Sequence, residues 1–184
     1  CRFASKIPLN PIGCGFEAYY KYPLYEAWKL AGEALFLQAK QNYSKDKNAI
    51  CWKILKHAGS TYEAGFTKSN SALCDAFTNL LHTVTSDSIV SAVAHKIRSN
   101  ESLLALLQHS PQREKRLRAF FDKVIDVADK DEEGIGYMDV AYQLMVQLYD
   151  ALEQGEIQDV SSLVSTAYSM LRTAKFINGE EDKQ

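Results

Sequence analysis

Apolar residues recur every three or four positions along most of the chain, which is the period of an amphipathic helix. The clearest stripe lies in residues 23–41, where Leu24, Trp28 and Leu35 fall on one side of the predicted helix. Such a stripe is typical of a helix that packs in a core, so we expect Trp28 to be buried. Gly32 interrupts this helix, and because glycine lets another backbone come close, we expect a second helix to cross there.

Further helical patterns follow along the chain, each ended by a polar segment, a glycine or a proline. They cover residues 44–57, 71–84, 86–97, 99–107, 110–128, 139–154 and 158–177. A short extra turn is expected at residues 61–66. Alternation of period two never persists for more than a few residues, so no strand is predicted. The sequence therefore predicts an all-α, single-domain bundle of about eight helices.

The ends of the chain differ from this central pattern. Residues 1–15 are predicted to be an irregular lead-in, because prolines and glycines interrupt any regular element. Residues 16–178 form the predicted helical domain, and residues 179–184 a disordered acidic tail. The sequence begins with Cys1 rather than methionine, so we expect a fragment of a larger protein.

The charge balance argues against a broad electrostatic role. The formal net charge is −2, and the tail from Glu180 onward holds three acids and one lysine, which also sum to −2. The rest of the chain is formally neutral, which gives no strong signal for nucleic acid. No apolar run reaches the length of a membrane-spanning helix, so a soluble protein without a transmembrane segment is predicted.

Four cysteines are present, Cys1, Cys14, Cys51 and Cys74, and their disulfide status stays open. Their low density favours a reducing compartment over a disulfide scaffold. No CxxC or Cys/His ligand spacing occurs, so no metal is predicted. The sequence also lacks a P-loop, an HExxH motif and a nucleophile elbow, so no cofactor and no enzymatic activity is favoured.

Cys14 supports an alternative hypothesis. It lies between two glycines, just before a predicted helical region, where the helix dipole would favour its thiolate. Cys14 would then be the nucleophile of a cysteine-dependent hydrolase or transferase, completed by regions outside this chain. The four histidines, which could supply the base, are all distant in sequence.

An acidic segment, Asp129 to Gly134, resembles the first half of an EF-hand loop, with oxygen ligands at alternate positions followed by a glycine. Val140 stands where an EF-hand has its bidentate glutamate. Since the site would lose its strongest ligand, we predict that it does not bind calcium.

Two clusters suggest binding surfaces. Arg113, Lys115, Arg116 and Arg118 lie on the outer faces of one predicted helix, which gives a further alternative: contact with anionic lipid or phosphate, including peripheral membrane contact. Four tyrosines, Tyr19, Tyr20, Tyr22 and Tyr25, fall within seven positions. Tyrosine is enriched at protein interfaces. The favoured interpretation is therefore an adaptor-type module that binds another protein through these tyrosines.

Overall fold

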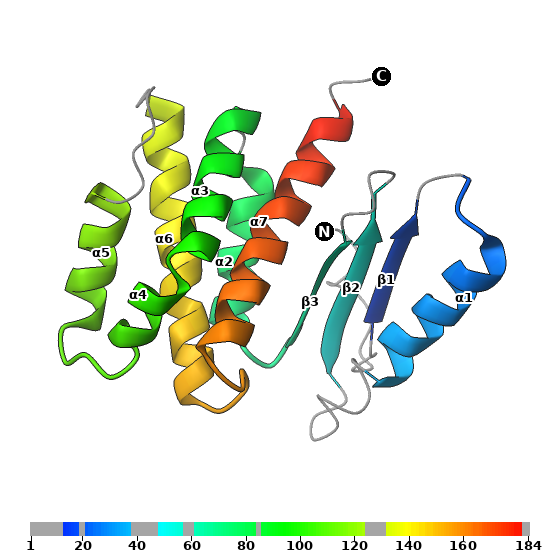
Figure 1. Cartoon of the computed structure of the whole chain (residues 1–184), viewed down its shortest axis with the longest axis horizontal. Helices are drawn as coiled ribbons and strands as arrows, with labels where there is room; N and C mark the ends of the chain where they lie inside the picture. The colour runs from blue at the N-terminus through cyan, green and yellow to red at the C-terminus, as the bar shows by residue number, and fades with distance from the viewer. Residues whose placement is uncertain are drawn as a thin grey trace. The chain divides into compact units, whose positions relative to one another are not determined.

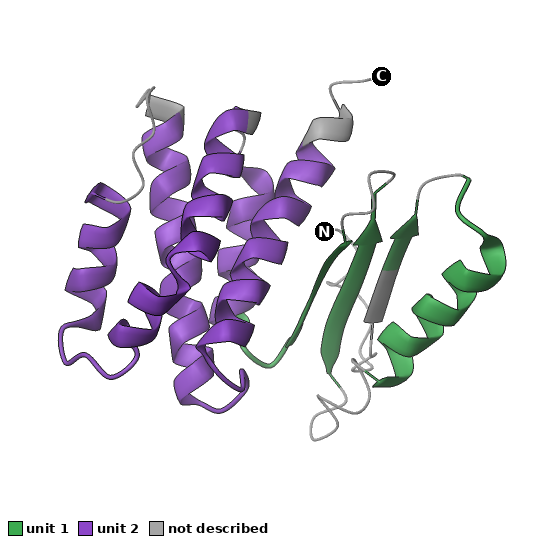
Figure 2. Ribbon diagram, viewed as in Figure 1, with its two compact units in different colours: residues 1–71 green, residues 72–184 purple. Residues whose placement is uncertain are grey.

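The computed structural model describes residues 13–18, 21–37, 48–56, 61–83, 86–123 and 132–181. This described part contains seven helices and a three-stranded sheet (Figure 1). The prediction of an all-α bundle of about eight helices is therefore wrong. The chain divides into two compact units, residues 1–71 and residues 72–184 (Figure 2). The boundaries predicted after residues 15 and 178 stay predictions.

The first unit is a small sheet with one crossover helix. Its elements are β1 (Gly13–Ala18), α1 (Leu24–Glu33), β2 (Ala49–Leu55) and β3 (Thr61–Thr67). The strand order is β1-β2-β3, with β1 parallel to β2 and β2 antiparallel to β3. Parallel neighbours need a crossover connection, and α1 is that connection, running alongside β1 (Figure 1).

The helix predicted over residues 44–57 is replaced by β2, and the turn predicted at residues 61–66 is replaced by β3. The reason is that β2 is a short run buried on both of its faces, and such a run fits a helix as well as a strand. Trp52 and Ile54 of β2, and Tyr62 and Phe66 of β3, are all buried on one face of the sheet. The Trp52 and Phe66 rings meet edge to face at 5.9 Å between centroids, an arrangement that stabilises aromatic pairs.

The opposite face of the sheet is tied together by charge and by close packing. Lys53 and Glu63 are directly opposed across the two strands, and the Lys53 Nζ lies 2.8 Å from the Glu63 Oε2. The backbone at Gly65 approaches the buried Cys51, its register partner. A Cβ at Gly65 would lie only 2.5 Å from the Cys51 Sγ. Glycine is therefore required there by the position of the sulfur.

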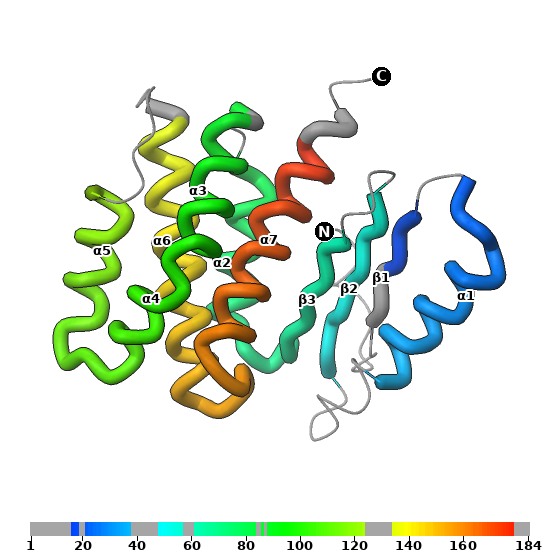
Figure 3. The backbone as a smooth tube through the Cα atoms, in the orientation of Figure 1, coloured from blue at the N-terminus to red at the C-terminus, as the bar shows by residue number. Residues whose placement is uncertain are grey.

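The regular elements among the described residues of the second unit are all helices. Its helices are α2 (Ser71–His82), which begins at the unit boundary, α3 (Asp87–Ser99), α4 (Glu101–Leu107), α5 (Arg113–Lys123), α6 (Glu132–Glu153) and α7 (Val160–Glu181). Neighbouring pairs include α3 with α7, α6 with α7 and α5 with α6 (Figure 3). The largest fully buried side chains here include Leu80, Ile97, Leu104, Leu117, Tyr137, Leu144 and Tyr149.

Turn chemistry sets the connection between the two longest helices. Gly155 has a φ of 75°, and the next N–H, of Glu156, donates to the Ala151 carbonyl at 2.9 Å, which closes the end of α6. The predicted helix stop at Gly155 is confirmed. At the start of α7, the Asp159 Oδ1 accepts the Ser162 N–H at 2.7 Å. This bond holds the pKa of Asp159 below its usual value.

Two helix ends differ from the prediction. α6 begins at Glu132, before the predicted start at residue 139. α7 runs to Glu181, past the predicted stop at Gly179 and into the segment expected to be disordered. None of the helices in the described ranges is long and apolar enough to cross a bilayer.

Candidate functional site

One side of α1 exposes large apolar side chains to solvent. Leu24 is 84% exposed, Tyr25 80%, Trp28 79% and Phe36 56%. Phe36 lies in a wider helical turn that continues α1 through residue 37. We call these four residues the α1 face. The prediction that Trp28 packs in the core is wrong.

The reason is that α1 packs on the sheet by a different side. Ala34 is the most buried residue of this helical segment, at 2% exposure, and Ala27 and Leu30 on the same side are half-buried. Small residues let the helix lie close to β1. Leu24, Tyr25 and Trp28 point elsewhere, so the part of the predicted apolar stripe that holds Leu24 and Trp28 is outer surface instead.

The crossing helix expected at Gly32 is absent from the described part of the chain. A Cβ built on Gly32 would meet no described atom within 4 Å. Glycine lowers the stability of a helix by about 1 kcal/mol relative to alanine. No contact with a described residue offsets this loss at Gly32. Open space beside Gly32 adjoins the α1 face, since Tyr25 and Phe36 lie along the same row of the helix.

The predicted tyrosine cluster is divided by the structure. Tyr25 belongs to the α1 face, whereas Tyr22 precedes the helix and is half-buried with contacts of its own. Tyr19 and Tyr20 lie outside the described residues. The residues that sequence reasoning missed on this surface are Leu24, Trp28 and Phe36. A usable signal was present, because Ala27 and Ala34 lie on a different side of this helix from Tyr25 and Trp28.

Arg113 of the predicted anion cluster is engaged within the helical unit. Its Nη2 lies 3.0 Å from the Asp150 Oδ1, its Nη1 pairs with Glu153, and its guanidinium lies over the Tyr149 ring at 5.4 Å. Burial raises the pKa of Asp150, and the charge of Arg113 opposes that rise. This side chain holds α5 against α6.

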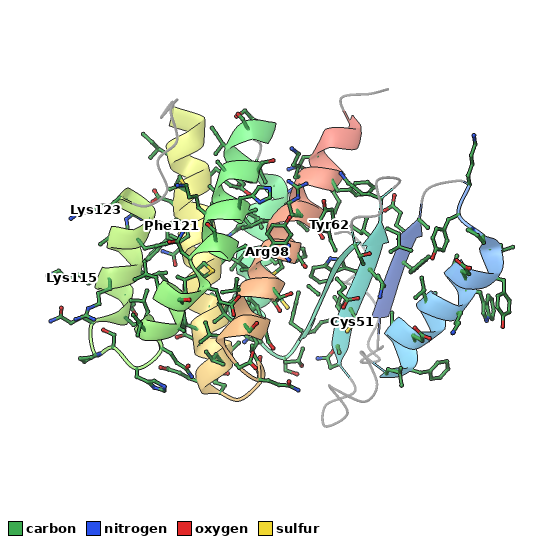
Figure 4. The ribbon with its side chains drawn as sticks, viewed as in Figure 1. Cys51, Tyr62, Arg98, Lys115, Phe121 and Lys123 are labelled. Atoms are coloured by element: carbon green, nitrogen blue, oxygen red, sulfur yellow. The ribbon has the colours of Figure 1, made fainter. Side chains whose placement is uncertain are left out.

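Arg118 has a similar role nearer the other end of α5. Its Nη1 lies 2.6 Å from the Asp139 Oδ1, and its guanidinium lies over the Tyr142 ring at 5.2 Å. The hydrogen bond to Asp139 raises the pKa of Arg118 further above its usual value. Lys115 and Arg116 are exposed, and Figure 4 shows Lys115 pointing away from the helices. Two of the four predicted basic residues therefore face solvent, and two are ion-paired.

Cys14 does not precede a helix. It lies inside β1, where its backbone is in register with Cys51 of β2. The helix-dipole argument for a lowered thiol pKa therefore does not apply, and the position of its side chain lies outside the described residues. The hypothesis of a Cys14 nucleophile stays untested.

The acidic segment is part helix. Residues from Glu132 onward belong to α6, so Gly134 is not the turn glycine of a loop. Residues 129–131 lie outside the described residues. Among the described side chains, no group of three or more His, Cys, Asp or Glu residues is placed to hold a metal ion. The prediction that this segment does not bind calcium stays a prediction.

A polar seam between α3 and α7 was not predicted. The Ser91 Oγ accepts hydrogen bonds from the Arg172 Nη1 at 3.1 Å and the Lys175 Nζ at 3.0 Å. The guanidinium of Arg98, labelled in Figure 4, lies over the Tyr168 ring at 4.9 Å. These contacts join two helices far apart in sequence, and sequence spacing within one helix could not indicate them.

Comparison with known proteins identifies no family for this chain. No protein-family model matches the sequence, and no curated protein matches it.

Proposed function

We propose that the protein is a non-enzymatic, adaptor-type interaction module that binds another protein through the α1 face. The observation that supports this proposal is the exposure of Leu24, Tyr25 and Trp28, each near 80% or above. Single exposed apolar residues are common on proteins, but contiguous large ones are not. Three of them within the first turns of α1, with Phe36 about two turns further along the same side, are therefore most simply explained by a surface that becomes covered on binding.

The amount of surface supports the same conclusion. Each aromatic side chain offers roughly 150–250 Å², so the α1 face exposes on the order of 500 Å² of apolar surface. This value is at the upper end of the largest patch on a typical monomer, a size that is often functional. Tyrosine and tryptophan are also the residues most enriched among binding hot spots.

Site-specific photo-crosslinking in cells that express the full chain tests this proposal. Trp28 is replaced by p-benzoylphenylalanine, and the matched control carries the same probe at Leu106 of α4, which is 74% exposed. We expect a discrete protein adduct from the probe at position 28 and none of that mass from position 106.

A second variant shows whether the adduct depends on the α1 face. Adding Tyr25→Ser and Phe36→Ser to the position-28 probe should abolish the adduct, because removing anchor residues costs about 1–2 kcal/mol each in binding. Adducts of equal mass and yield from both probe positions, or an adduct that survives the two substitutions, would contradict the proposal. The circular dichroism of each variant confirms that it folds.

A further inference from the structure

We infer that the partner bound by the α1 face is a second copy of this chain, with the two α1 helices packed antiparallel about a two-fold axis near Ala31. This inference rests on the proposed function and names the partner for that surface. A two-fold interface must be self-complementary, because the same patch is used by both copies. Three properties of α1 meet that requirement.

The first property is the distribution of side-chain size along the helix. Ala31 and Gly32 are small and stand midway along the helix, where Gly32 lies within the α1 face and the half-buried Ala31 lies at its edge. Trp28 lies three residues before Ala31 and Leu35 four residues after it, so a bulky side chain flanks the small pair on each side. Reversing the helix direction gives nearly the same pattern of large and small, as an antiparallel contact between identical helices requires.

The second property is the space at Gly32. No described atom lies within 4 Å of a Cβ built there, although a glycine in a helix interior is costly. Small residues at a crossing point let two helix backbones approach closely, so that the flanking large side chains can interdigitate. The crossing helix that this glycine predicts would come from the second copy.

The third property is charge. Lys29 lies two residues before Ala31 and Glu33 two residues after it, and both are exposed. Neither forms an ion pair with another described residue. An antiparallel two-fold axis at Ala31 places Lys29 of each copy opposite Glu33 of the other, which forms two reciprocal ion pairs at the rim. Such pairs select the partner and its orientation more than they add affinity.

The area is close to the lower limit for a specific pair. Two α1 faces of on the order of 500 Å² each, together with the charged rim, approach the roughly 1,200 Å² at which specific interfaces begin. An interface at that lower limit predicts a dimer of micromolar rather than nanomolar affinity.

Sedimentation equilibrium of the purified full chain between about 1 and 100 µM tests the inference. We expect a reversible monomer–dimer equilibrium for the wild type and a monomer for Trp28→Ser, with unchanged circular dichroism. A wild type that remains monomeric across this range would overturn the inference.

Charge reversal tests the pairing itself. Lys29→Glu and Glu33→Lys should each weaken self-association about 5- to 10-fold, because each places like charges opposite one another twice per dimer. Mixing the two single variants restores both opposite-charge pairs only between copies, so the mixture should form heterodimers with near wild-type affinity. A mixture that associates no better than either variant alone would overturn the antiparallel arrangement.

Glycine substitution provides a matched control. Gly32→Ala should raise helix stability but weaken the dimer, whereas Gly136→Ala in α6, which also has no described atom within 4 Å of its Cβ, should leave the dimer unchanged. Equal effects of the two would overturn the close crossing at Gly32. If the wild type is monomeric but the probe at position 28 captures a different protein in cells, the inference fails and the proposed function stands. If both experiments are negative, both fail.

Discussion

α1 and α3 are both amphipathic helices, yet they use their large apolar residues in opposite ways. The apolar side of α3 is buried in the helical unit through Ile89, Val90, Val93, Ala94 and Ile97. In α1 the alanine side packs on the sheet, and Trp28 and its neighbours are exposed. The difference shows that an apolar stripe predicts the phase of a helix but not the element that covers it. For α3 the cover is α7, and for α1 we propose a second copy.

The largest expected effect contrasts two aromatic residues, one from each unit. Phe121 is 2% exposed and its ring contacts Phe120 and Tyr142 edge to face; Figure 4 labels it on α5. Phe121→Ala should lower the free energy of unfolding by about 3–5 kcal/mol. Trp28→Ala, measured where the chain is monomeric, should change it by less than about 1 kcal/mol.

Urea unfolding followed by circular dichroism measures both variants of this pair. Equal losses in the free energy of unfolding would show that Trp28 is buried within the monomer. α1 and α3 would then not differ in how they use their large apolar residues.

A smaller loss of stability is expected from a substitution in the sheet of the first unit. The sheet is tightly packed at Gly65, although the α1 face of the same unit is exposed. Gly65→Ala places a Cβ within 2.5 Å of the Cys51 Sγ and 3.2 Å of the Ile50 carbonyl. We expect a loss of about 1–3 kcal/mol from this overpacking. Both tryptophans of the chain, Trp28 and Trp52, lie in this unit, so tryptophan fluorescence during unfolding reports on it alone.

The cause of that loss can be isolated with a second substitution. Combining Gly65→Ala with Cys51→Ala removes the sulfur, so the double variant should lose less stability than the sum of the two single changes. Strict additivity would argue that the sulfur is not the obstacle.

In the second unit, a buried hydroxyl should give an effect of about 1–2 kcal/mol. The Tyr149 hydroxyl donates to the Leu104 carbonyl at 2.8 Å, and Tyr149→Phe removes that bond. The matched control is Tyr137→Phe, because the buried Tyr137 hydroxyl has no hydrogen-bond partner among the described residues. The control should be neutral or slightly stabilising. A loss for Tyr137→Phe as large as that for Tyr149→Phe would contradict the assignment.

The same tyrosine predicts a dependence on pH. Burial raises the pKa of Tyr149 from 10.0 to about 12, against the opposing charge of Arg113. The folded state therefore favours the neutral phenol more than the unfolded state does. Its contribution is complete below about pH 10 and is lost as pH rises from about 10 to 12. Denaturation at a series of alkaline pH values should show a shallower decline for Tyr149→Phe than for the wild type.

The smallest expected change in stability distinguishes the ion-paired from the solvent-exposed basic residues of α5. Arg113→Ala should cost about 1 kcal/mol, because it leaves the partly buried Asp150 without its ion-pair partner. Arg116→Ala should stay within about 0.5 kcal/mol, since that side chain is exposed. Thermal unfolding of both variants checks the difference. Equal melting temperatures would show that the Arg113 ion pairs do not stabilise the packing of α5 on α6.

The helices of the second unit could be predicted because their signals are long and local. Stripes of several turns, together with stops such as Gly155, place most of these helices to within a few residues. The sheet could not be predicted in the same way. Ile50 and Ile54 are four residues apart and fit a helix as well as a strand, and β2 and β3 are only seven residues long each.

Only part of the candidate site could be predicted from the sequence. The segment that contains Tyr25 was identified, but Trp28 was assigned to the core because burial depends on tertiary packing, which helix periodicity does not encode. Arg113 and Arg118 could not be separated from Lys115 and Arg116, since their acidic partners lie on another helix or at positions that spacing alone does not distinguish. Periodicity identifies the apolar side of a helix, but only the fold shows which element packs against that side.

The parallel pairing of β1 with β2 also has a consequence for the order of folding. Gly13 aligns with Ile50, so the two ends of the whole crossover segment have to be brought together before the first bond of that ladder can form. β2 and β3 pair through a short connection, and α3 and α4 are nearly continuous in sequence. The hairpin and the helices can therefore form early from local contacts. We therefore expect the entry of β1 at the edge of the sheet to be the slow, entropically demanding step, and until it occurs the side of α1 that holds Ala34 lacks its cover.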